Sequence, residues 1–322
     1  MRVLVFTHMY PTNQHPEYGV FVQQQVESLR KEGVETDVLF VNPKTSKWNY
    51  PWSLFRLLKR AYTRRYDLIH AHYVFAGLVA RCQFHLPLVV THHGDETFHG
   101  WQRRLCWGIS RLASGVIVPS AEVKRAIGLE DAAVIPCGVD FELFKPMAQD
   151  LSRKELGLPQ GKGLILFAGD YLKQLKRFDL IQEAVALVKA KAQDVDLVVA
   201  FKQPYEKIPL YMNACDVLVL ASDREGSPQV IKEAMACNLP VVTVNVGDTS
   251  EVLEGVDGCH VCEQNPEEIA SKLFSVLSSH RRTNGRELTR RYEIQGIAKK
   301  IINEYEKVLG DRLRPGLSLF CG

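Results

Sequence analysis

Short apolar runs of four to six residues recur along the chain, separated by longer stretches with helical periodicity. Such runs predict buried parallel strands, and the helices between them predict doubly wound α/β sheets. The predicted strands are 3–6, 36–41, 68–71, 88–91 and 116–119 in the first half, and 164–168, 197–200, 216–220 and 241–244 in the second. Three helices, 267–278, 282–291 and 294–309, are expected to end the fold.

The stretch 213–251 supports the most detailed prediction, in the order strand, polar loop, helix, strand and loop. Ser227 is expected to be the N-cap of the helix and Pro228 its first residue, because proline lacks the N–H that a first turn leaves unpaired. The helix should end near Cys237, since Asn238 tolerates the left-handed conformation of a helix end.

Two carboxylates lie beside the start of this helix and inside it. Glu225 precedes the helix and Glu233 lies within it, with seven residues between them. A helix N-terminus carries unpaired N–H groups and a partial positive charge, so it favours a phosphate or another anion. Carboxylates there can accept hydrogen bonds from hydroxyls, which fits a sugar joined through phosphates to a ribose. The same spacing also occurs on solvated helix faces, and only the surrounding strand–loop–helix context favours a binding site.

At these residues the segment resembles the donor-sugar site of the family-4 retaining glycosyltransferases (glycosyltransferases group 1). Their signature, E-G-x-P-x-x-x-x-E, is matched by Glu225, Gly226, Ser227, Pro228 and Glu233. The resemblance implies the GT-B fold, two Rossmann-like doubly wound parallel-sheet domains facing across a cleft. It also implies that Glu225, with the backbone of Gly226 and Ser227, holds the sugar of a nucleotide-diphospho-sugar. Glu233 would hold the ribose.

Four histidines follow two neighbouring predicted strands of the first half. Because parallel sheets bind ligands at the carboxyl ends of their strands, these imidazoles are candidate site residues. From the residues alone, a metal site with Asp95 or Glu96 and a structural role at the strand ends both remain open. The histidines are His70, His72, His92 and His93.

The loop 91–96 (T-H-H-G-D-E) is similar to the T-x-H-G-x-D loop of the same family. The resemblance implies that His93 forms a hydrogen bond with the donor sugar near the reacting carbon. Glu96 stands where the family often has Asp, which is a mild departure from the pattern.

The resemblance also implies contacts to the donor diphosphate. Gly19 matches a glycine whose backbone approaches the phosphates, although it equally fits a plain helix start. Gly169 and Lys176 match a glycine and a lysine of the second domain. The arginine that the family carries soon after this glycine is absent, so Lys173 or Arg177 would have to replace it, unless both are ordinary surface charges.

The segment 134–147 is similar to the family's I-P-N-G-V-D-x-x-x-F-x-P linker. We therefore predict an N-terminal Rossmann-like acceptor-side domain over 1–145 and a C-terminal nucleotide-sugar-binding domain over 146–305, followed by an end and tail over 306–322. The hinge is expected at 140–147. In the resembling fold the last helix crosses back onto the first domain.

Composition narrows the function classes. The formal net charge of +3 is too small to indicate nucleic-acid binding. Eight cysteines without framework spacing, some in apolar positions such as Cys82, Cys215 and Cys237, suggest reduced thiols. A single C-x-x-C at 259–262 is weak support for zinc, and the D-x-D at 194–196 precedes its strand, where a metal–nucleotide site is not expected. No signal peptide and no membrane span are expected, which points to a cytoplasmic protein.

The segment 47–66 contains six basic residues, two tryptophans and no acidic residue. A basic amphipathic stretch of this kind can lie on an anionic membrane on its cytoplasmic side. It equally fits an ordinary surface helix whose arginine stems cover apolar surface.

The expected activity is therefore metal-independent transfer of a hexose, with retention, from a nucleotide-diphospho-sugar to a carbohydrate or lipid-linked acceptor in surface polysaccharide or glycolipid synthesis. His93, Glu225 and Lys176 are the expected catalytic residues, and no cofactor is expected. Two alternatives remain, a nucleotide-sugar 2-epimerase of the same fold and a non-catalytic sugar-nucleotide-binding relative. The absent arginine motivates the second alternative.

Overall fold

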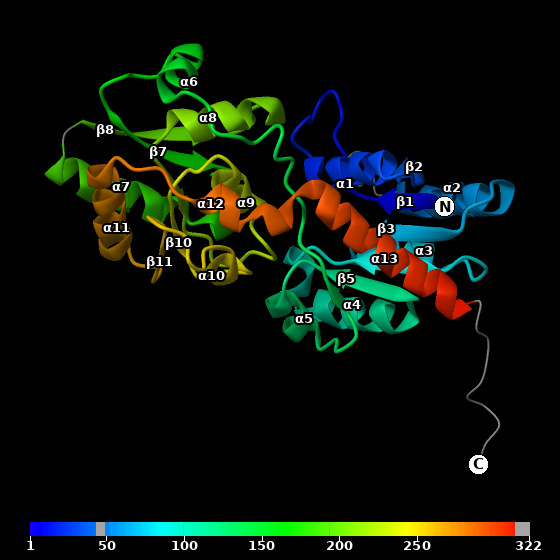
Figure 1. The fold of residues 1–322 in the computed structure, drawn as a ribbon. Coiled ribbons are helices and arrows are strands. Elements are labelled where there is room, and N and C mark those ends of the chain that lie inside the picture. The colour runs from blue at the N-terminus through cyan, green and yellow to red at the C-terminus, as the bar shows by residue number, and fades with distance from the viewer. Residues whose placement is uncertain (43–48, 99, 193, 313–322) are drawn as a thin grey trace. The chain divides into compact units, whose positions relative to one another are not determined.

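The computed structural model describes residues 1–42, 49–98, 100–192 and 194–312 (Figure 1). The chain forms two compact units. The first unit comprises Met1–Gly138 and the segment that begins at Ile294, and the second unit is Val139–Glu293. Each unit is built on one parallel sheet, so the predicted pair of doubly wound α/β domains is confirmed.

The first unit contains a six-stranded sheet with the order β2-β1-β3-β4-β5-β6. Its strands are β1 (Arg2–Thr7), β2 (Glu35–Phe40), β3 (Leu68–His72), β4 (Leu88–Thr91), β5 (Gly115–Val118) and β6 (Ala133–Val134). The first five agree with the predicted strands to within one residue, whereas β6 is too short to give an apolar run. The register pairs Thr7 with His72 and His72 with Thr91, so the carboxyl ends of the central strands meet at one edge.

Helices cover both faces of this sheet, because its strands are apolar on both faces. Successive residues of β1 show the alternation: Leu4 and Phe6 pack into one hydrophobic core, and Val3 and Val5 into the other. On the Leu4 side lie α2 (Asn49–Thr63), α3 (Val74–Ala80), α4 (Gly100–Leu112) and α5 (Ala121–Ile127), with the short 3-10 helix η1 (Asp95–Thr97). On the Val3 side lie α1 (Val20–Lys31) and α13 (Ile294–Arg312).

The position of α13 corrects the predicted domain limits. Residues 294–305 were assigned to the C-terminal domain, but Ile297, Ile301 and Tyr305 are buried in the core of the first unit. The helix therefore belongs to the first unit, as the crossing helix of the resembling fold implies. Residues 313–322 of the expected tail lie outside the described residues.

The predicted hinge at 140–147 also differs from the structure. Phe141 and Phe144 are buried in the core of the second unit. The guanidinium of Arg286 donates hydrogen bonds to the carbonyl oxygens of both, at 2.9 and 2.6 Å. Because these residues are fixed inside the second unit, the chain passes between the units at Gly138–Val139 and at Glu293–Ile294.

The second unit contains a five-stranded parallel sheet with the order β11-β10-β9-β7-β8. Its strands are β7 (Gly163–Ala168), β8 (Val195–Ala200), β9 (Val217–Leu220), β10 (Val241–Val244) and β11 (His260–Cys262). Its helices are α6 (Gln149–Leu156), α7 (Phe178–Lys191), α8 (Ile208–Ala214), α9 (Gln229–Ala236), α10 (Thr249–Val252), α11 (Pro266–Ser279) and α12 (Gly285–Leu288), with the 3-10 helices η2 (Gln174–Lys176), η3 (Tyr205–Lys207) and η4 (Arg290–Tyr292).

Three smaller expectations can be compared with the structure. The helix predicted over 282–291 is only the short α12 followed by η4. Asp196 of the D-x-D motif lies within β8 and pairs with Lys162 and Lys189 at 2.7 and 3.1 Å, which is a surface ion-pair cluster. The described cysteines are free thiols, and Cys82 is exposed rather than in the core.

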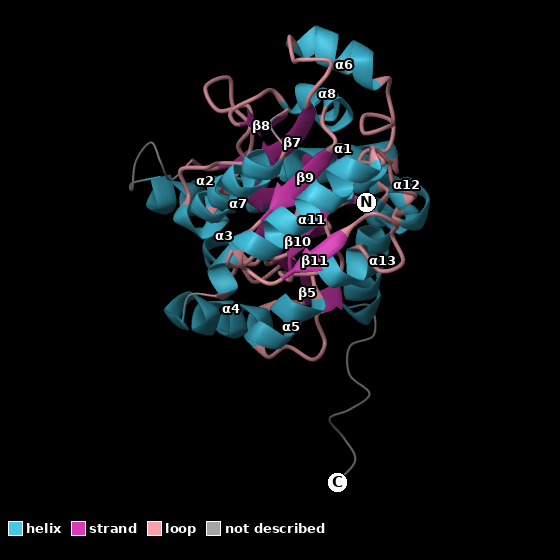
Figure 2. Cartoon of the chain, turned by 90° about the vertical axis from the view of Figure 1, so that its left-hand side faces the viewer, coloured by secondary structure: helices cyan, strands magenta, loops and turns pink. Residues whose placement is uncertain are grey.

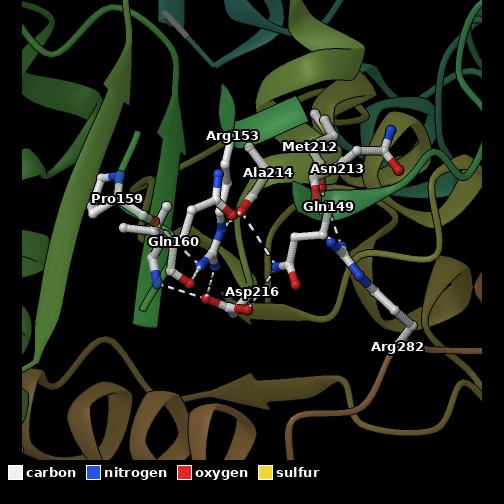
Figure 3. A network of polar contacts seen from close by, with 10 residues as sticks. Gln149, Arg153, Pro159, Gln160, Met212, Asn213, Ala214, Asp216 and Arg282 are labelled. Carbon is white, nitrogen blue, oxygen red and sulfur yellow. Dashed lines mark hydrogen bonds and ion pairs between the residues drawn. The ribbon is translucent and has the colours of Figure 1, made fainter. Parts of the chain in front are cut away.

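A buried arginine joins α6 to the amino ends of the strands (Figure 3). The guanidinium of Arg153 donates to Asp216 Oδ2 at 2.9 Å and to the carbonyl oxygen of Ala214 at 2.8 Å. Asp216 Oδ2 also accepts the backbone N–H of Leu164 at the start of β7, at 2.7 Å. Gln149 donates to Asp216 Oδ1 at 2.8 Å. This network fixes the end of the sheet opposite to the edge at which ligands bind in such folds.

Candidate functional site

Three loops meet at the carboxyl edge of the sheet in the second unit. The loop after β7 contacts the loop after β9 through Lys176 and Glu225, and also through a backbone hydrogen bond from Asp223 to Leu175 at 2.8 Å. The loop after β9 contacts the loop after β10 through Ser227 and Asp248. The predicted residues Lys176, Glu225 and Ser227 therefore lie in one layer of loops above the strand ends.

Glu225 and Lys176 form a half-buried ion pair in this layer. The Lys176 Nζ lies 2.6 Å from Glu225 Oε1, and the hydroxyl of Ser222 donates to the same oxygen at 2.7 Å. Both bonds reach Oε1, so Oε2 can accept a hydrogen bond from a ligand hydroxyl. The pair thus places a cation and a hydroxyl acceptor side by side at the carboxyl edge of the sheet.

The start of α9 differs from the prediction. Its N-cap is Pro228 and its first residue is Gln229, so the prediction that Ser227 caps the helix is wrong. The hydroxyl of Ser227 instead donates to Asp248 Oδ2 at 2.8 Å, and the ammonium of Lys232 contacts both groups, at 2.7 Å for Asp248 Oδ2. Because its hydroxyl is engaged inside the protein, Ser227 can offer a ligand its backbone rather than its side chain.

Gly247 allows the loop after β10 to pack against the Glu225–Gly226 backbone. Its φ is +61°, and a Cβ at this position would lie 3.1 Å from the carbonyl oxygens of Glu225 and Gly226. A side chain would therefore push the two loops apart. Sequence reasoning did not identify Gly247 or Asp248, although the G-D pair after a predicted strand was the available signal.

Glu233 is buried inside α9, and its carboxylate accepts a hydrogen bond from the Tyr205 hydroxyl at 2.7 Å. Burial raises the pKa of Glu233 to about 7, because the charged form is desolvated, and the Tyr205 hydroxyl opposes this shift. Tyr205 begins η3 after β8 and was not predicted as a site residue. The carboxyl of Glu233 thus titrates near neutral pH, and its ionised form is the better acceptor for ligand hydroxyls.

The shifted pKa predicts a stability change with pH. An unfolded glutamate ionises near 4.5, whereas folded Glu233 keeps its proton until about 7, so the folded state binds more protons between these values. The free energy of unfolding should therefore fall by on the order of 3 kcal/mol as the pH rises through this window. The stabilising contribution of Glu233 is fully present below pH 4.5 and is lost above pH 7. We expect Glu233→Gln to lack this contribution in urea titrations at pH 4.5 and 8, and the exposed Glu254→Gln to retain it. Equal pH slopes for wild type and Glu233→Gln would contradict the assignment.

The loop after β7 carries the other predicted diphosphate contacts. Arg177 has a left-handed backbone (φ +47°) and donates to Asp179 at 3.0 Å and to Asp223 at 3.3 Å. Its guanidinium is thus already shared by two carboxylates, whereas the side chain of Lys173 is exposed to solvent. At Gly169 a Cβ would meet only the ring of Phe167, at 3.4 Å, so glycine is not required there by packing.

Gly19 of the first unit is the N-cap of α1 and has a left-handed conformation, with φ +75°. A Cβ at this position would lie 2.5 Å from the carbonyl carbon of Met9, so only glycine allows the loop after β1 to pass this closely. The expected helix start is present. The phosphate contact implied by the resemblance stays a prediction.

Two of the four strand-end histidines are held inside the first unit. His70 is buried between the Tyr305 hydroxyl at 2.6 Å from Nδ1 and the Thr91 hydroxyl at 2.7 Å from Nε2, which joins β3 and β4 to α13. His92 is buried between Glu96 at 3.0 Å and Ser110 at 2.9 Å. Both imidazoles use both ring nitrogens within the fold, which supports the structural interpretation for these two residues.

His93 and His72 form a hydrogen-bonded pair at the ends of β4 and β3, with 3.0 Å between His93 Nε2 and His72 Nδ1. The rings of Phe21 and Tyr73 pack against His93, with centroids 4.8 and 4.5 Å away. Burial lowers the pKa of His72 to about 3 and lowers that of His93 well below its usual range. Burial therefore favours the neutral imidazole of His93, and Nδ1 is the ring nitrogen that does not take part in the bond to His72.

Among the described residues, one group has the donor types of a metal site. Ligand atoms of His92, Glu96 and Cys106 lie within 4.8 Å of one another and are buried. A metal would have to displace the bonds of His92 to Glu96 and Ser110, and burial holds the pKa of the Cys106 thiol far above neutrality. The group fits a buried hydrogen-bond network better than a metal centre. The side chain of Asp95 lies outside the described residues.

The chain matches two family models, described as Glycosyltransferase Family 4 over residues 1–143 and as Glycosyl transferases group 1 over residues 199–279. It is 24% identical over 324 residues to TuaC of Bacillus subtilis, a glycosyltransferase assigned to teichuronic acid biosynthesis, covering 78% of this chain and 83% of that protein. It is 29% identical over 269 residues to the D-inositol 3-phosphate glycosyltransferase of Nocardiopsis dassonvillei, covering 66% of this chain and only 62% of that relative's length.

The fold is similar to that of the HepE protein of Anabaena, solved in complex with UDP and glucose. The TM-score is 0.74 at 20% identity, with 95% of this chain and 100% of that chain covered. None of the helices in the described part of the chain is both long and apolar enough to cross a bilayer.

Proposed function

Because this chain belongs to the family-4 and group-1 glycosyltransferases of the GT-B fold, we propose that it transfers a sugar, with retention, from a nucleotide-diphospho-sugar to an acceptor hydroxyl. The observation that carries the proposal is the Lys176–Glu225 pair, set beside the first turn of α9 with Glu233 one turn further on. The matched relatives and the UDP and glucose named for HepE support a nucleotide-sugar ligand.

In the proposed complex the second unit holds the donor. Oε2 of Glu225 and the backbone of Gly226 and Ser227 would bind the sugar, and the carboxylate of Glu233 would bind the ribose. Pro228 would set the direction of the first turn of α9, so that its N–H groups face the diphosphate. Lys176 would neutralise the diphosphate.

In the first unit, Gly19 would approach the diphosphate with its backbone and His93 would donate from Nδ1 to a sugar hydroxyl. The bond between the anomeric carbon and the diphosphate oxygen breaks, and the diphosphate keeps the electron pair. A new bond forms between the anomeric carbon and the acceptor oxygen, and the proton of the acceptor hydroxyl would pass to the departing diphosphate. Lys176 and backbone N–H groups would stabilise the charge that develops on the diphosphate, without a metal ion or another cofactor. Binding both substrates in alignment would lower the barrier further.

For the acceptor we propose a carbohydrate or lipid-linked carbohydrate of surface polysaccharide or glycolipid synthesis, used on the cytoplasmic side of a membrane. The assignment of TuaC to teichuronic acid biosynthesis supports this class. A hexose is the sugar class that we propose, because its several hydroxyls suit the carboxylate of Glu225 and the neutral imidazole of His93. Nucleic acid is not proposed as a partner, because the net charge is only +3.

The donor site can be tested by calorimetric titration of nucleotide-diphospho-sugars into the wild-type protein and Glu233→Ala. We expect one donor to bind in the micromolar range and to bind about tenfold or more weakly to the variant, which corresponds to roughly 1.4 kcal/mol. The exposed Glu254→Ala, which changes the same residue type outside the site, should bind like wild type. Failure of every donor to bind would contradict the proposal.

A non-catalytic relative is the second candidate, because the Arg177 guanidinium is engaged by Asp179 and Asp223. It predicts donor binding without release of nucleoside diphosphate in the presence of acceptors. A 2-epimerase of the same fold would instead isomerise the sugar nucleotide without any acceptor. Chromatography of donor incubated with and without an acceptor mixture distinguishes all three outcomes.

A further inference from the structure

The outer faces of α2 and α4 expose large aromatic side chains that lie outside the hydrophobic core. On α2 the buried side faces the core through Leu57, and on α4 it does so through Cys106. The aromatic side chains project away from these residues and are between 47% and 66% exposed. They are Trp52, Phe55 and Tyr62 on α2, and Trp101 and Trp107 on α4.

Basic residues are interleaved with these aromatics in the sequence. The helices α2, α3 and α4 contain no acidic residue. Between residues 49 and 121 the sequence has nine basic residues and three acidic ones. Of the three, Asp67 accepts the backbone N–H of Arg2 at 2.6 Å, and Glu96 is buried against His92. The basic residues on the outside of α2 and α4 are Arg56, Lys59, Arg103, Arg104 and Arg111.

The two helices belong to one continuous layer. Helix α3 lies between α2 and α4 on the same face of the first unit's sheet, and Figure 2 shows the three one below another along one side. The ring of Phe75 on α3 lies 6.1 Å from that of Trp101, and Tyr62 packs on His85 at 4.3 Å. We refer to the exposed aromatic and basic residues of α2 and α4 as the aromatic–basic surface.

We infer that the aromatic–basic surface binds the headgroup region of an anionic lipid bilayer. Tryptophan and tyrosine combine an apolar ring with a polar group and are favoured at membrane interfaces. Arginine and lysine stems can lie along the acyl boundary while their cations contact phosphate headgroups. The positive charges of α2 and α4 complement the anionic headgroups of such a bilayer. The aromatic rings between these charges can enter its apolar interior.

The inference extends the expectation for segment 47–66, part of which lies outside the described residues. It adds α4, a second helix far away in the sequence, whose aromatic and basic residues continue the surface. Two helices give a broader contact than one, and reversible binding through several weak contacts is what a peripheral protein needs. It does not depend on the proposed donor chemistry, since binding to vesicles is measured without substrates.

The test is flotation with vesicles of equal parts phosphatidylglycerol and phosphatidylcholine, compared with vesicles of phosphatidylcholine alone. We expect binding to the anionic vesicles that weakens about tenfold or more in 0.5 M salt, because the Debye length falls to about 4 Å and the attraction to an anionic surface is screened. A blue shift of tryptophan fluorescence should accompany binding, because the indole rings enter a less polar environment.

Two variants separate the contributions of the surface. Trp52→Ser/Trp101→Ser should lose the fluorescence shift and most of the binding. Arg103→Glu/Arg104→Glu should weaken binding to anionic vesicles by about tenfold or more. All four residues are outside the core, so melting curves should match those of wild type.

A charge-matched control is available on the other face of the same unit. Lys31→Glu/Lys300→Glu changes two exposed lysines on α1 and α13 by the same total charge and should bind like wild type. The inference is overturned if wild type does not bind anionic vesicles, if neither surface variant weakens binding, or if the control weakens it equally. Self-association of wild type without vesicle binding would assign the surface to a protein contact instead and would also overturn it.

Discussion

Lys176→Met should lower kcat by about two to three orders of magnitude while the protein stays folded. The substitution keeps an unbranched apolar stem and removes the charge that lies 2.6 Å from Glu225. Under the proposed function this ammonium stabilises the charge that develops on the leaving diphosphate, and loss of one such preorganised group typically costs about 10²–10³ in kcat. The measurement is the rate at which nucleoside diphosphate is released from saturating donor in the presence of an acceptor mixture.

The control for this prediction is Lys191→Met, an exposed lysine at the end of α7, which should keep the wild-type rate. Lys173→Met asks a separate question, namely whether this exposed lysine replaces the family's missing arginine. A Lys176→Met enzyme with the wild-type kcat would show that the diphosphate is neutralised elsewhere. A large loss at Lys173 alone would then identify the cation that does so.

The strands of the fold could be predicted closely, because parallel strands are buried on both faces and give unbroken apolar runs. Strands β4 and β10 begin and end where their runs do. The unit to which α13 belongs could not be predicted in the same way. Its apolar side shows that the helix is covered, but the pattern is the same whichever sheet covers it. Only the packing of Ile297 and Tyr305 into the first unit decides the question.

The sequence singles out the candidate residues of the site, and their contact with a ligand stays a prediction; it does not show the side chains to which they are hydrogen-bonded. Glu225 and Glu233 lie in one recognisable signature and Lys176 matches a lysine of the resembling family, whereas Tyr205 reaches Glu233 from another loop. Hydrogen bonds between loops depend on tertiary structure, and no local spacing encodes them. The four histidines show the same limit, since their types and positions are alike. Only the neighbours of each ring distinguish them. His70 and His92 are each bonded to other side chains of the fold, whereas His72 and His93 are bonded to each other.

Substitution of Lys232 should be among the most destabilising changes in the second unit, although the residue is not one of the matched signature positions. The side chain of Lys232 is 1% exposed and that of Asp248 is 6% exposed, with 2.7 Å between Nζ and Oδ2. The ammonium also lies over the ring of Tyr292, 5.1 Å from its centroid. We expect Lys232→Met to destabilise the unit by about 3 to 5 kcal/mol, because the Asp248 charge would stay buried without its partner. Denaturant unfolding of the variant and wild type measures this difference.

The double variant Lys232→Met/Asp248→Asn tests the cause of that loss. Removing both charges leaves no uncompensated ion, and the amide oxygen of an asparagine can still accept the Ser227 hydroxyl, so most of the lost stability should return. The recovered protein should also regain donor binding if the buried pair acts only by holding the loop after β10 against Gly226. A double variant as unstable as Lys232→Met would mean that packing of the lysine stem, not the charge, stabilises the unit. A Lys232→Met protein within about 1 kcal/mol of wild type would contradict the prediction altogether.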